Sequence, residues 1–141
     1  MSLLQDEDRE EVGKQLAGLT NPVQLIMFTQ AMECDFCANT RGLVEEVASL
    51  SNTVEAVICD FVSDTDEVAE YQIDKIPAIA VVGEKDYGVR FYGMPSGYEF
   101  VSLIEALKMV SSGQSGLSDA TKAALAEIDR AAHFQVFVTP T

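Results

Sequence analysis

The sequence is poor in basic residues. It has 141 residues, of which 9 are Lys or Arg and 23 are Asp or Glu, so the formal net charge at pH 7 is −14. Such a charge repels nucleic-acid phosphate and anionic lipid surfaces. We therefore expect neither a nucleic acid nor a membrane among the partners.

Long apolar runs and a basic N-terminus are also lacking. No apolar stretch reaches the ~20 residues of a membrane span, and the first ten residues are mostly acidic, unlike a signal peptide. The chain has only three cysteines, an odd and low number that does not fit a secreted disulfide framework. These features favour a cytoplasmic protein.

The composition that remains is that of an ordinary globular chain. Hydrophobic residues make up 48% and charged residues 23%, which suits one core in a chain of this length. No internal repeat is evident. The sequence predicts a domain over residues 1–112. Residues 113–141 then form a short Ser/Gly linker, a helix over 118–130 capped by Ser118, and a strand over 134–139.

The predicted elements alternate in type along the domain. Helical spacing of apolar residues predicts helices over 6–19, 35–50, 64–71 and 98–110, and dense apolar segments predict strands over 23–29, 53–61, 78–82 and 87–92. The first strand is apolar throughout, which is typical of a central strand buried on both faces. Two parallel crossovers followed by a hairpin indicate an α/β fold with a mixed four-stranded sheet flanked by helices.

The strongest chemical signal is the pair Cys34 and Cys37, separated by two residues at the predicted junction of a strand and a helix. A helix N-terminus stabilises a nearby anion, which lowers the pKa of a cysteine placed there. Cys34 is therefore predicted to be the attacking thiol and Cys37, deeper in the helix, the resolving one. The carboxylates of Glu33 and Asp35 oppose the thiolate. Inert thiols or half of a zinc site are the alternatives, although Cys59 and His133 form no second pair for zinc.

The second candidate feature of the site is Ile76-Pro77. A proline before a strand is compatible with a cis peptide bond, and equally with a proline that simply begins the strand. A cis proline facing the sulfurs would expose the backbone of Ile76 to an extended substrate chain.

Cys59, in an apolar strand, is predicted to be a core residue. The acidic residues from Asp60 to Glu70 lack calcium-loop spacing and fit a solvated face.

Together these features resemble the thioredoxin/glutaredoxin superfamily. The stretches 21–26, 34–37, 71–78 and 87–100 look like the first unit of the glutaredoxin-like protein disulfide oxidoreductases, which carry two thioredoxin-fold units, each with its own Cys-x-x-Cys. Residues 95–100 also resemble the N-terminal region of the alkyl hydroperoxide reductase flavoprotein subunit, in which the first unit has lost its Cys-x-x-Cys, so the pair retained here favours the disulfide oxidoreductase. In the two-unit family the second unit begins with a strand ending in Thr-Pro-Thr, as residues 139–141 do here, so the resemblance implies an N-terminal half.

The resemblance implies a thioredoxin-like fold with an extra N-terminal helix and a thiol–disulfide oxidoreductase acting on protein disulfides. Cys34 and Cys37 are its catalytic residues, and Pro77 is the cis-proline. The candidate substrate-binding residues are Asp35, Phe36, Ile76 and Pro77. No bound cofactor or metal is required, and an external reductant is needed to recharge the pair.

Glutathione is disfavoured as the specific partner, because Met32-Glu33 replaces the lysine that glutaredoxins carry before the motif and no Gly-Gly follows. Two alternatives stay open, an electron-relay arm of a peroxide-reducing system and a non-catalytic docking module. The predicted strand 134–139 is expected to pair with a second copy as a homodimer, to lie against its own domain, or to be loose.

Overall fold

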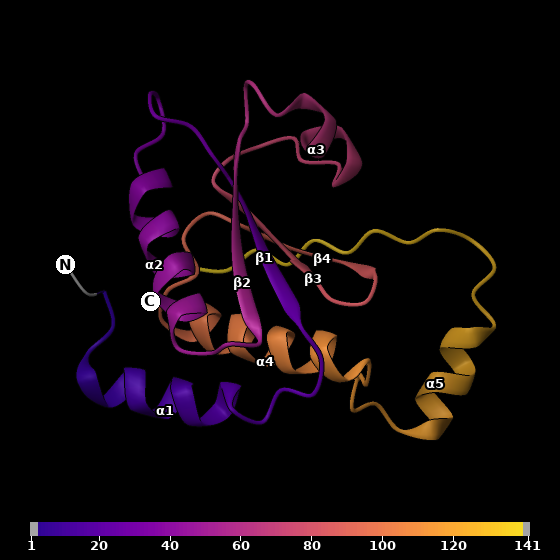
Figure 1. The fold of residues 1–141 in the computed structure, drawn as a ribbon. Helices are drawn as coiled ribbons and strands as arrows, with labels where there is room; N and C mark the ends of the chain where they lie inside the picture. The colour runs from indigo at the N-terminus through magenta and orange to yellow at the C-terminus, as the bar shows by residue number, and fades with distance from the viewer. Residues whose placement is uncertain (1–2, 140–141) are drawn as a thin grey trace.

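The computed structural model describes residues 3–139 and builds them around one four-stranded sheet (Figure 1). The strands are β1 (Val23–Thr29), β2 (Val54–Asp60), β3 (Ala78–Val82) and β4 (Asp86–Tyr92), in the spatial order β2-β1-β3-β4. β1 and β2 are parallel, whereas β3 is antiparallel to both β1 and β4. The mixed sheet predicted from the sequence is therefore confirmed. The second of the two predicted parallel crossovers is wrong, because β3 runs antiparallel to β1 and only β1 and β2 are joined as parallel strands.

Five helices accompany the sheet in the described part of the chain. They are α1 (Asp6–Leu16), α2 (Cys37–Ser49), α3 (Thr65–Glu70), α4 (Tyr98–Ser112) and α5 (Asp119–Ala126). α2 is the crossover between the parallel strands, and α1 and α4 pack beside each other below it in Figure 1. α3 lies at the upper end of the sheet, on the other side of β2.

β1 is buried on both faces, as its continuous apolarity predicts. Leu25 and Met27 contribute to the larger core cluster with α1, α2 and α4, and Ile26 and Phe28 contribute to a smaller one on the opposite face. Alternate residues of a strand point to opposite faces, so a strand covered on both sides needs apolar residues at every position. This central strand fixes where the loop after Thr29 leaves the sheet.

The β3–β4 hairpin passes very close to α4, and a glycine allows the approach. A Cβ placed on Gly83 would come within 2.8 Å of Val110 Cγ1 and 2.9 Å of the Val110 carbonyl oxygen. α4 ends at Ser112, and the following Gly113 has a φ of 66°, the left-handed conformation that glycine adopts at little cost. Both glycines help the long helix lie against the sheet.

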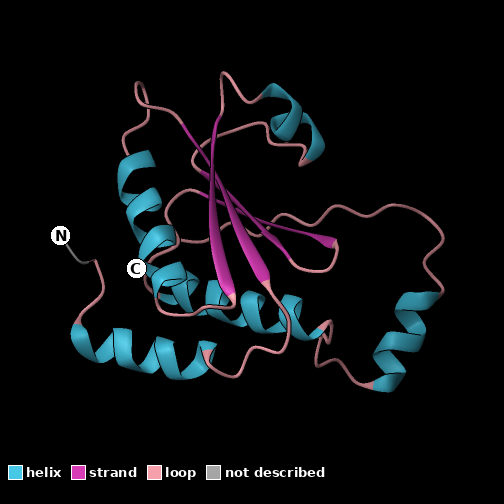
Figure 2. Ribbon diagram, in the orientation of Figure 1, coloured by secondary structure: helices cyan, strands magenta, loops and turns pink. Residues whose placement is uncertain are grey.

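The predicted strand over residues 134–139 is wrong. The described part of this segment, up to Thr139, forms no ladder with any strand, and Pro140 and Thr141 lie outside the described residues (Figure 2). Phe134 is 85% exposed and Phe137 is 90% exposed. An apolar pattern favours a strand only where the segment can join the edge of a sheet, and residues 134–139 are not part of the four-stranded sheet.

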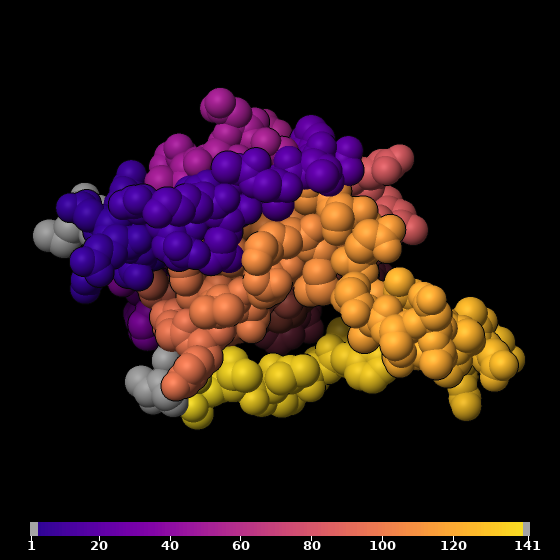
Figure 3. All heavy atoms as spheres, turned by 90° about the horizontal axis from the view of Figure 1, so that it is seen from below, coloured from indigo at the N-terminus to yellow at the C-terminus, as the bar shows by residue number. Residues whose placement is uncertain are grey.

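The remaining differences are in element ends. α1 stops at Leu16 rather than residue 19, and α5 stops at Ala126 rather than 130, although Ser118 caps it as predicted by accepting a hydrogen bond from the Thr121 N–H. α5 and the segment after it lie on the outside of the molecule, in gold and yellow in Figure 3. No helix within residues 3–139 is long and apolar enough to cross a bilayer.

Candidate functional site

The two cysteines of the motif lie where β1 passes into α2. Cys34 and Cys37 are joined by a disulfide with their Cα atoms 5.4 Å apart. Cys34 lies in the loop before the helix and is partly exposed, whereas Cys37 is the first residue of α2 and is 1% exposed. Cys34 is therefore the more exposed residue of the pair.

Hydrogen bonds hold the loop that carries Cys34. The side-chain amide of Gln30 donates to the carbonyl oxygen of Met32 at 2.6 Å. At the helix end, the backbone N–H of Thr40 and its hydroxyl both donate to the carbonyl oxygen of Phe36, at 2.9 and 2.8 Å. Glu33 has a φ of 57°, a left-handed conformation that costs a non-glycine residue free energy. The path of the loop is thus defined on both sides of Cys34.

The Ile76–Pro77 bond is cis, as the resemblance implies. Pro77 directly precedes β3, and its carbonyl oxygen accepts a hydrogen bond of 2.9 Å from the N–H of Gly93. Ala78 pairs with Phe28 near the end of β1, so Pro77 lies at the same end of the sheet as the cysteine loop. The fold thus brings together two features that are 40 residues apart in the sequence.

The other candidate substrate-binding residues differ in exposure. Asp35 and Phe36 are exposed between the cysteines, and Ile76 is half-buried against the smaller core cluster. Next to Ile76, Lys75 forms an ion pair with Asp74 and lies 4.3 Å from the centroid of the Tyr92 ring. The hydrogen bond from Lys75 lowers the pKa of Asp74, and the same bond raises the pKa of Lys75.

Cys59 is separate from this pair. It is buried in β2, in register with Phe28, and has no disulfide partner. Burial, followed by the nearby carboxylates of Asp64 and Glu67, raises the pKa of its thiol. The predicted core position of Cys59 is confirmed. Within residues 3–139, no group of three or more His, Cys, Asp or Glu side chains lies in a metal-binding arrangement.

Sequence reasoning missed two residues at the site. Met32 is 75% exposed two residues before Cys34, a position that depends on how the loop leaves the sheet. Thr40 is fully buried and anchors the carbonyl of Phe36. A threonine one turn inside a predicted helix could have indicated that back-bond, because hydroxyls commonly bond the carbonyl four residues earlier.

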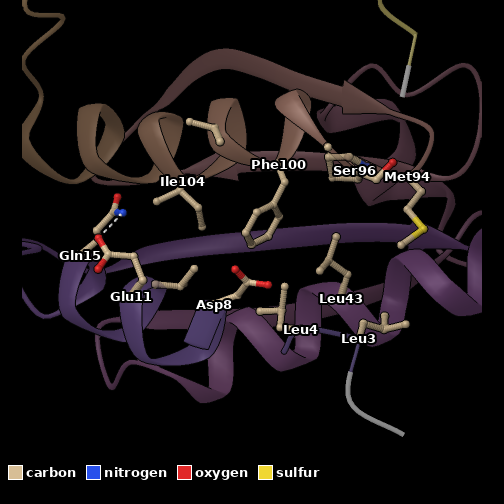
Figure 4. Close-up of a pocket in the computed structure, with 14 residues that line it drawn as sticks. Leu3, Leu4, Asp8, Glu11, Gln15, Leu43, Met94, Ser96, Phe100 and Ile104 are labelled. Carbon is tan, nitrogen blue, oxygen red and sulfur yellow. Dashed lines mark hydrogen bonds between the residues drawn. The ribbon is translucent and has the colours of Figure 1, made fainter. Parts of the chain in front are cut away.

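A cavity of about 490 Å³ lies elsewhere, between α1 and α4 (Figure 4). Phe100 and Ile104 reach into it from α4, and the carboxylates of Asp8 and Glu11 lie at its α1 side. Neither Cys34 nor Cys37 lines this cavity. This cavity is therefore separate from the cysteine pair.

Several known proteins that are similar to the chain in structure or sequence are redox proteins. No family model matches it. It is similar to a protein disulfide oxidoreductase from Aeropyrum pernix, with a TM-score of 0.78, 29% identity, and coverage of 87% of this chain and 54% of the other. It is also similar in fold to the NTD_N/C domain of alkylhydroperoxide reductase AhpF from Enterococcus faecalis, with a TM-score of 0.76, 24% identity, and coverage of 85% and 58%.

Two further likenesses extend this picture. A thioredoxin from Fasciola hepatica matches with a TM-score of 0.54 at 20% identity, over 72% of this chain and 92% of the other. A Bacillus subtilis protein named NADH dehydrogenase is 29% identical over 119 residues, which are 83% of this chain and 21% of that protein. The chain thus spans about a fifth of this curated relative and little over half of the first two structures.

The chain has a thioredoxin-like fold and carries a Cys-x-x-Cys pair at its strand–helix junction. The likeness to a disulfide oxidoreductase and the paired cysteines support thiol–disulfide redox chemistry, and with it a redox enzyme. The resemblance read from the sequence is confirmed at this level.

Proposed function

We propose that the chain is a thiol–disulfide oxidoreductase that acts on protein disulfides through Cys34 and Cys37. The observation that carries the proposal is the contrast between a partly exposed Cys34 and a buried Cys37 within one disulfide. An attacking sulfur must reach the substrate, and a resolving sulfur needs to reach only its neighbour. The different exposure of the two cysteines supports this division of roles.

The reaction begins with the reduced pair. The Cys34 thiolate attacks one sulfur of the substrate disulfide, forms a mixed disulfide, and expels the other substrate sulfur as a thiolate that takes up a proton. The Cys37 thiolate then attacks Cys34 Sγ, which re-forms the Cys34–Cys37 disulfide and releases the second substrate thiol. Two electrons pass to the substrate. An external dithiol returns them by the reverse steps, and oxidation of a substrate runs the same exchange backwards.

The Ile76–Pro77 segment is proposed to hold the substrate chain. It lies at the same end of the sheet as Cys34, and Ile76 is partly accessible. An extended peptide beside such an edge can form main-chain hydrogen bonds that do not depend on its sequence. Asp35 and Phe36 would contact the same chain, since both are exposed between the sulfurs. We place this chemistry in the cytoplasm, with protein disulfides and a dithiol reductant as partners and glutathione disfavoured.

One alternative is an electron-relay arm for a peroxide-reducing system. It is favoured by the fold likeness to the AhpF domain and by the match to one fifth of the B. subtilis protein named NADH dehydrogenase. In that setting the same pair would carry electrons from a flavoprotein to a peroxidase. A non-catalytic docking module remains the other alternative, and it would have no need of both sulfurs.

Substitution of the two cysteines tests the proposal. Cys34→Ser should abolish reduction of an insulin disulfide by dithiothreitol-recharged protein, since the attacking sulfur is gone. Cys37→Ser should accumulate a mixed disulfide with the substrate that mass spectrometry detects, because Cys34 attacks but nothing resolves. Cys59→Ser is the matched control and should retain activity. Full activity in Cys34→Ser would refute the proposal.

A further inference from the structure

Two apolar side chains stand exposed beside the disulfide. Met32 is 75% exposed and Phe36 is 60% exposed, and they precede and follow Cys34 by two residues. Both carbonyl oxygens are held, that of Met32 by Gln30 and that of Phe36 by Thr40. Exposed methionine and aromatic side chains on ordered backbone are typical of contact surfaces, because they bury much apolar area when a partner binds.

The residues around this surface carry mostly negative charge. Residues 30–36 and 60–77, which form the loops at this end of the sheet together with α3, contain eight carboxylates and one cation, Lys75. That cation is paired with Asp74. These 25 residues thus carry half of the net charge of −14.

The rest of the described chain is more balanced. Five ion pairs lie outside these two segments: Arg9–Glu46, Lys14–Glu10, Arg41–Glu45, Arg90–Asp86 and Lys108–Glu105. Within the segments, the carboxylates of Asp60 and Asp64 accept backbone hydrogen bonds and so organise the loop after β2. Glu33 and Asp35 instead flank Cys34 on the surface. The end of the molecule where a substrate disulfide must arrive therefore carries a strong excess of negative charge.

We infer that the partner of the Cys34–Cys37 pair carries its disulfide in a positively charged segment with an apolar side chain next to the cysteine. This inference rests on the proposed function, since it concerns the substrate of that site. Met32 and Phe36 contact the apolar side chain, and Glu33 and Asp35 attract the cationic residues around it. Opposite charges speed the encounter of two proteins, and apolar contact slows their separation. Electrons then pass to the partner's disulfide through attack by Cys34 and resolution by Cys37.

Four cyclic peptide disulfides test the inference with the pre-reduced full chain. They share one length and differ only in the flanking charge, Lys or Glu, and in the residue before the cysteine, Leu or Ser. Acid quenching and chromatography give the second-order rate constant for each. Two nearby charges should make the Lys peptides about three- to tenfold faster than the Glu peptides at low salt. Added salt should shrink this ratio, while the Leu peptides stay about five- to tenfold faster than the Ser peptides.

Paired variants assign each preference to its residues. Met32→Ser should lower the Leu-to-Ser ratio, and Met109→Ser, an exposed methionine in α4, should leave it unchanged. The double variant Glu33→Gln/Asp35→Asn should lower the Lys-to-Glu ratio. The double variant Glu84→Gln/Asp119→Asn removes the same charge from the β3–β4 hairpin and α5 and should preserve that ratio. Ratios are compared, so a change in the intrinsic reactivity of Cys34 cancels.

The outcomes distinguish failure of the inference about the substrate from failure of the proposed function. Equal rates for all four peptides, each still reduced by the protein, would overturn the inference and leave the proposed function standing. Failure to reduce any peptide, and also the small neutral bis(2-hydroxyethyl) disulfide, would overturn the proposed function itself and the inference with it. A Leu preference that survives in Met32→Ser would overturn the assignment of that contact.

Discussion

The three cysteines differ in their exposure and in their place in the fold. Cys34 is partly exposed before α2, Cys37 is buried in the first turn of that helix, and Cys59 is buried in β2. Reaction of a thiol requires both its thiolate form and access for the reagent. Burial and the carboxylates of Asp64 and Glu67 raise the pKa of Cys59, so it has less thiolate at any given pH.

We predict that Cys59 resists alkylation in the folded, reduced protein while Cys34 reacts. Because the pKa of Cys59 is raised, its labelling should begin only at a higher pH than that of an ordinary exposed thiol. Iodoacetamide pulses at several pH values, followed by peptide mass spectrometry, measure both rates. The denatured protein is the control, in which Cys59 should react fully. Equal labelling of Cys59 in the folded and unfolded protein would contradict the account.

Sequence reasoning located the cysteine pair because the signal lies in its spacing. The separation of Cys34 and Cys37 and their place after an apolar strand are visible in the sequence, and the cis bond before Pro77 followed from the family resemblance. The exposure of Met32 was not visible, because it depends on the direction in which the loop leaves β1. The roles of Asp35, Phe36 and Ile76 remain predictions, since exposure alone does not show what a residue binds.

At the scale of elements, one buried hydroxyl joins the end of α4 to the segment before β1. Ser111 is 2% exposed, and its hydroxyl accepts hydrogen bonds from the backbone N–H groups of Thr20 and Asn21, at 3.1 and 2.9 Å. The same hydroxyl donates to the carbonyl oxygen of Asn21 at 2.7 Å. These bonds link residues about 90 positions apart in the sequence and fix the entry of the central strand.

We predict that Ser111→Ala lowers the free energy of unfolding by about 1–3 kcal/mol, because it leaves two N–H groups without their acceptor. Urea unfolding followed by circular dichroism measures the change. Ser112→Ala is the matched control, since Ser112 is exposed and its hydroxyl bonds only nearby backbone, and it should change stability by about 0.5 kcal/mol or less. Equal effects of the two variants would show that the Ser111 network contributes nothing of its own.

The elements themselves were predictable to different degrees. β1 and β3 have the predicted ends because each is a dense apolar run bounded by proline or a turn. Helix ends were predicted less well, since the last turns of α1 and α5 depend on local hydrogen bonds. The C-terminal strand failed for a different reason. Phe134 to Thr139 has the composition of a strand, but a strand forms only beside a partner, and sequence composition does not reveal whether one is present.

At the scale of the whole molecule, the chain divides into a packed body and an exposed extension. Every described residue from Ser112 to Thr139 is exposed, and α5 contributes no buried residue. The extension nevertheless contains the apolar side chains of Phe134, Val136 and Phe137. Exposed apolar segments of this kind favour association, and β2 and β4 provide the two edges of the sheet.

We predict that the extension mediates self-association of the chain through residues 134–139. Sedimentation velocity at several concentrations should show a dimer that dissociates on dilution. A shortened chain ending at Gly113 should be monomeric and should melt within a few degrees of the full chain, because every described residue that is deleted is exposed. A full chain that is monomeric at every concentration would contradict the predicted association. A large loss of thermal stability on deletion would contradict the division into body and extension.

The central claim is that Cys34 and Cys37 form a working redox pair, and a redox titration tests it most directly. The full chain is equilibrated in thiol–disulfide buffers across a range of potentials, free thiols are trapped by alkylation, and the added labels are counted by mass. The account predicts one two-electron transition at Cys34 and Cys37, with Cys59 unchanged. A midpoint of about −270 mV would favour a reductase, and one of about −120 to −180 mV an oxidase or isomerase. Absence of any transition, or thiols that become reactive only after a chelator is added, would contradict the account.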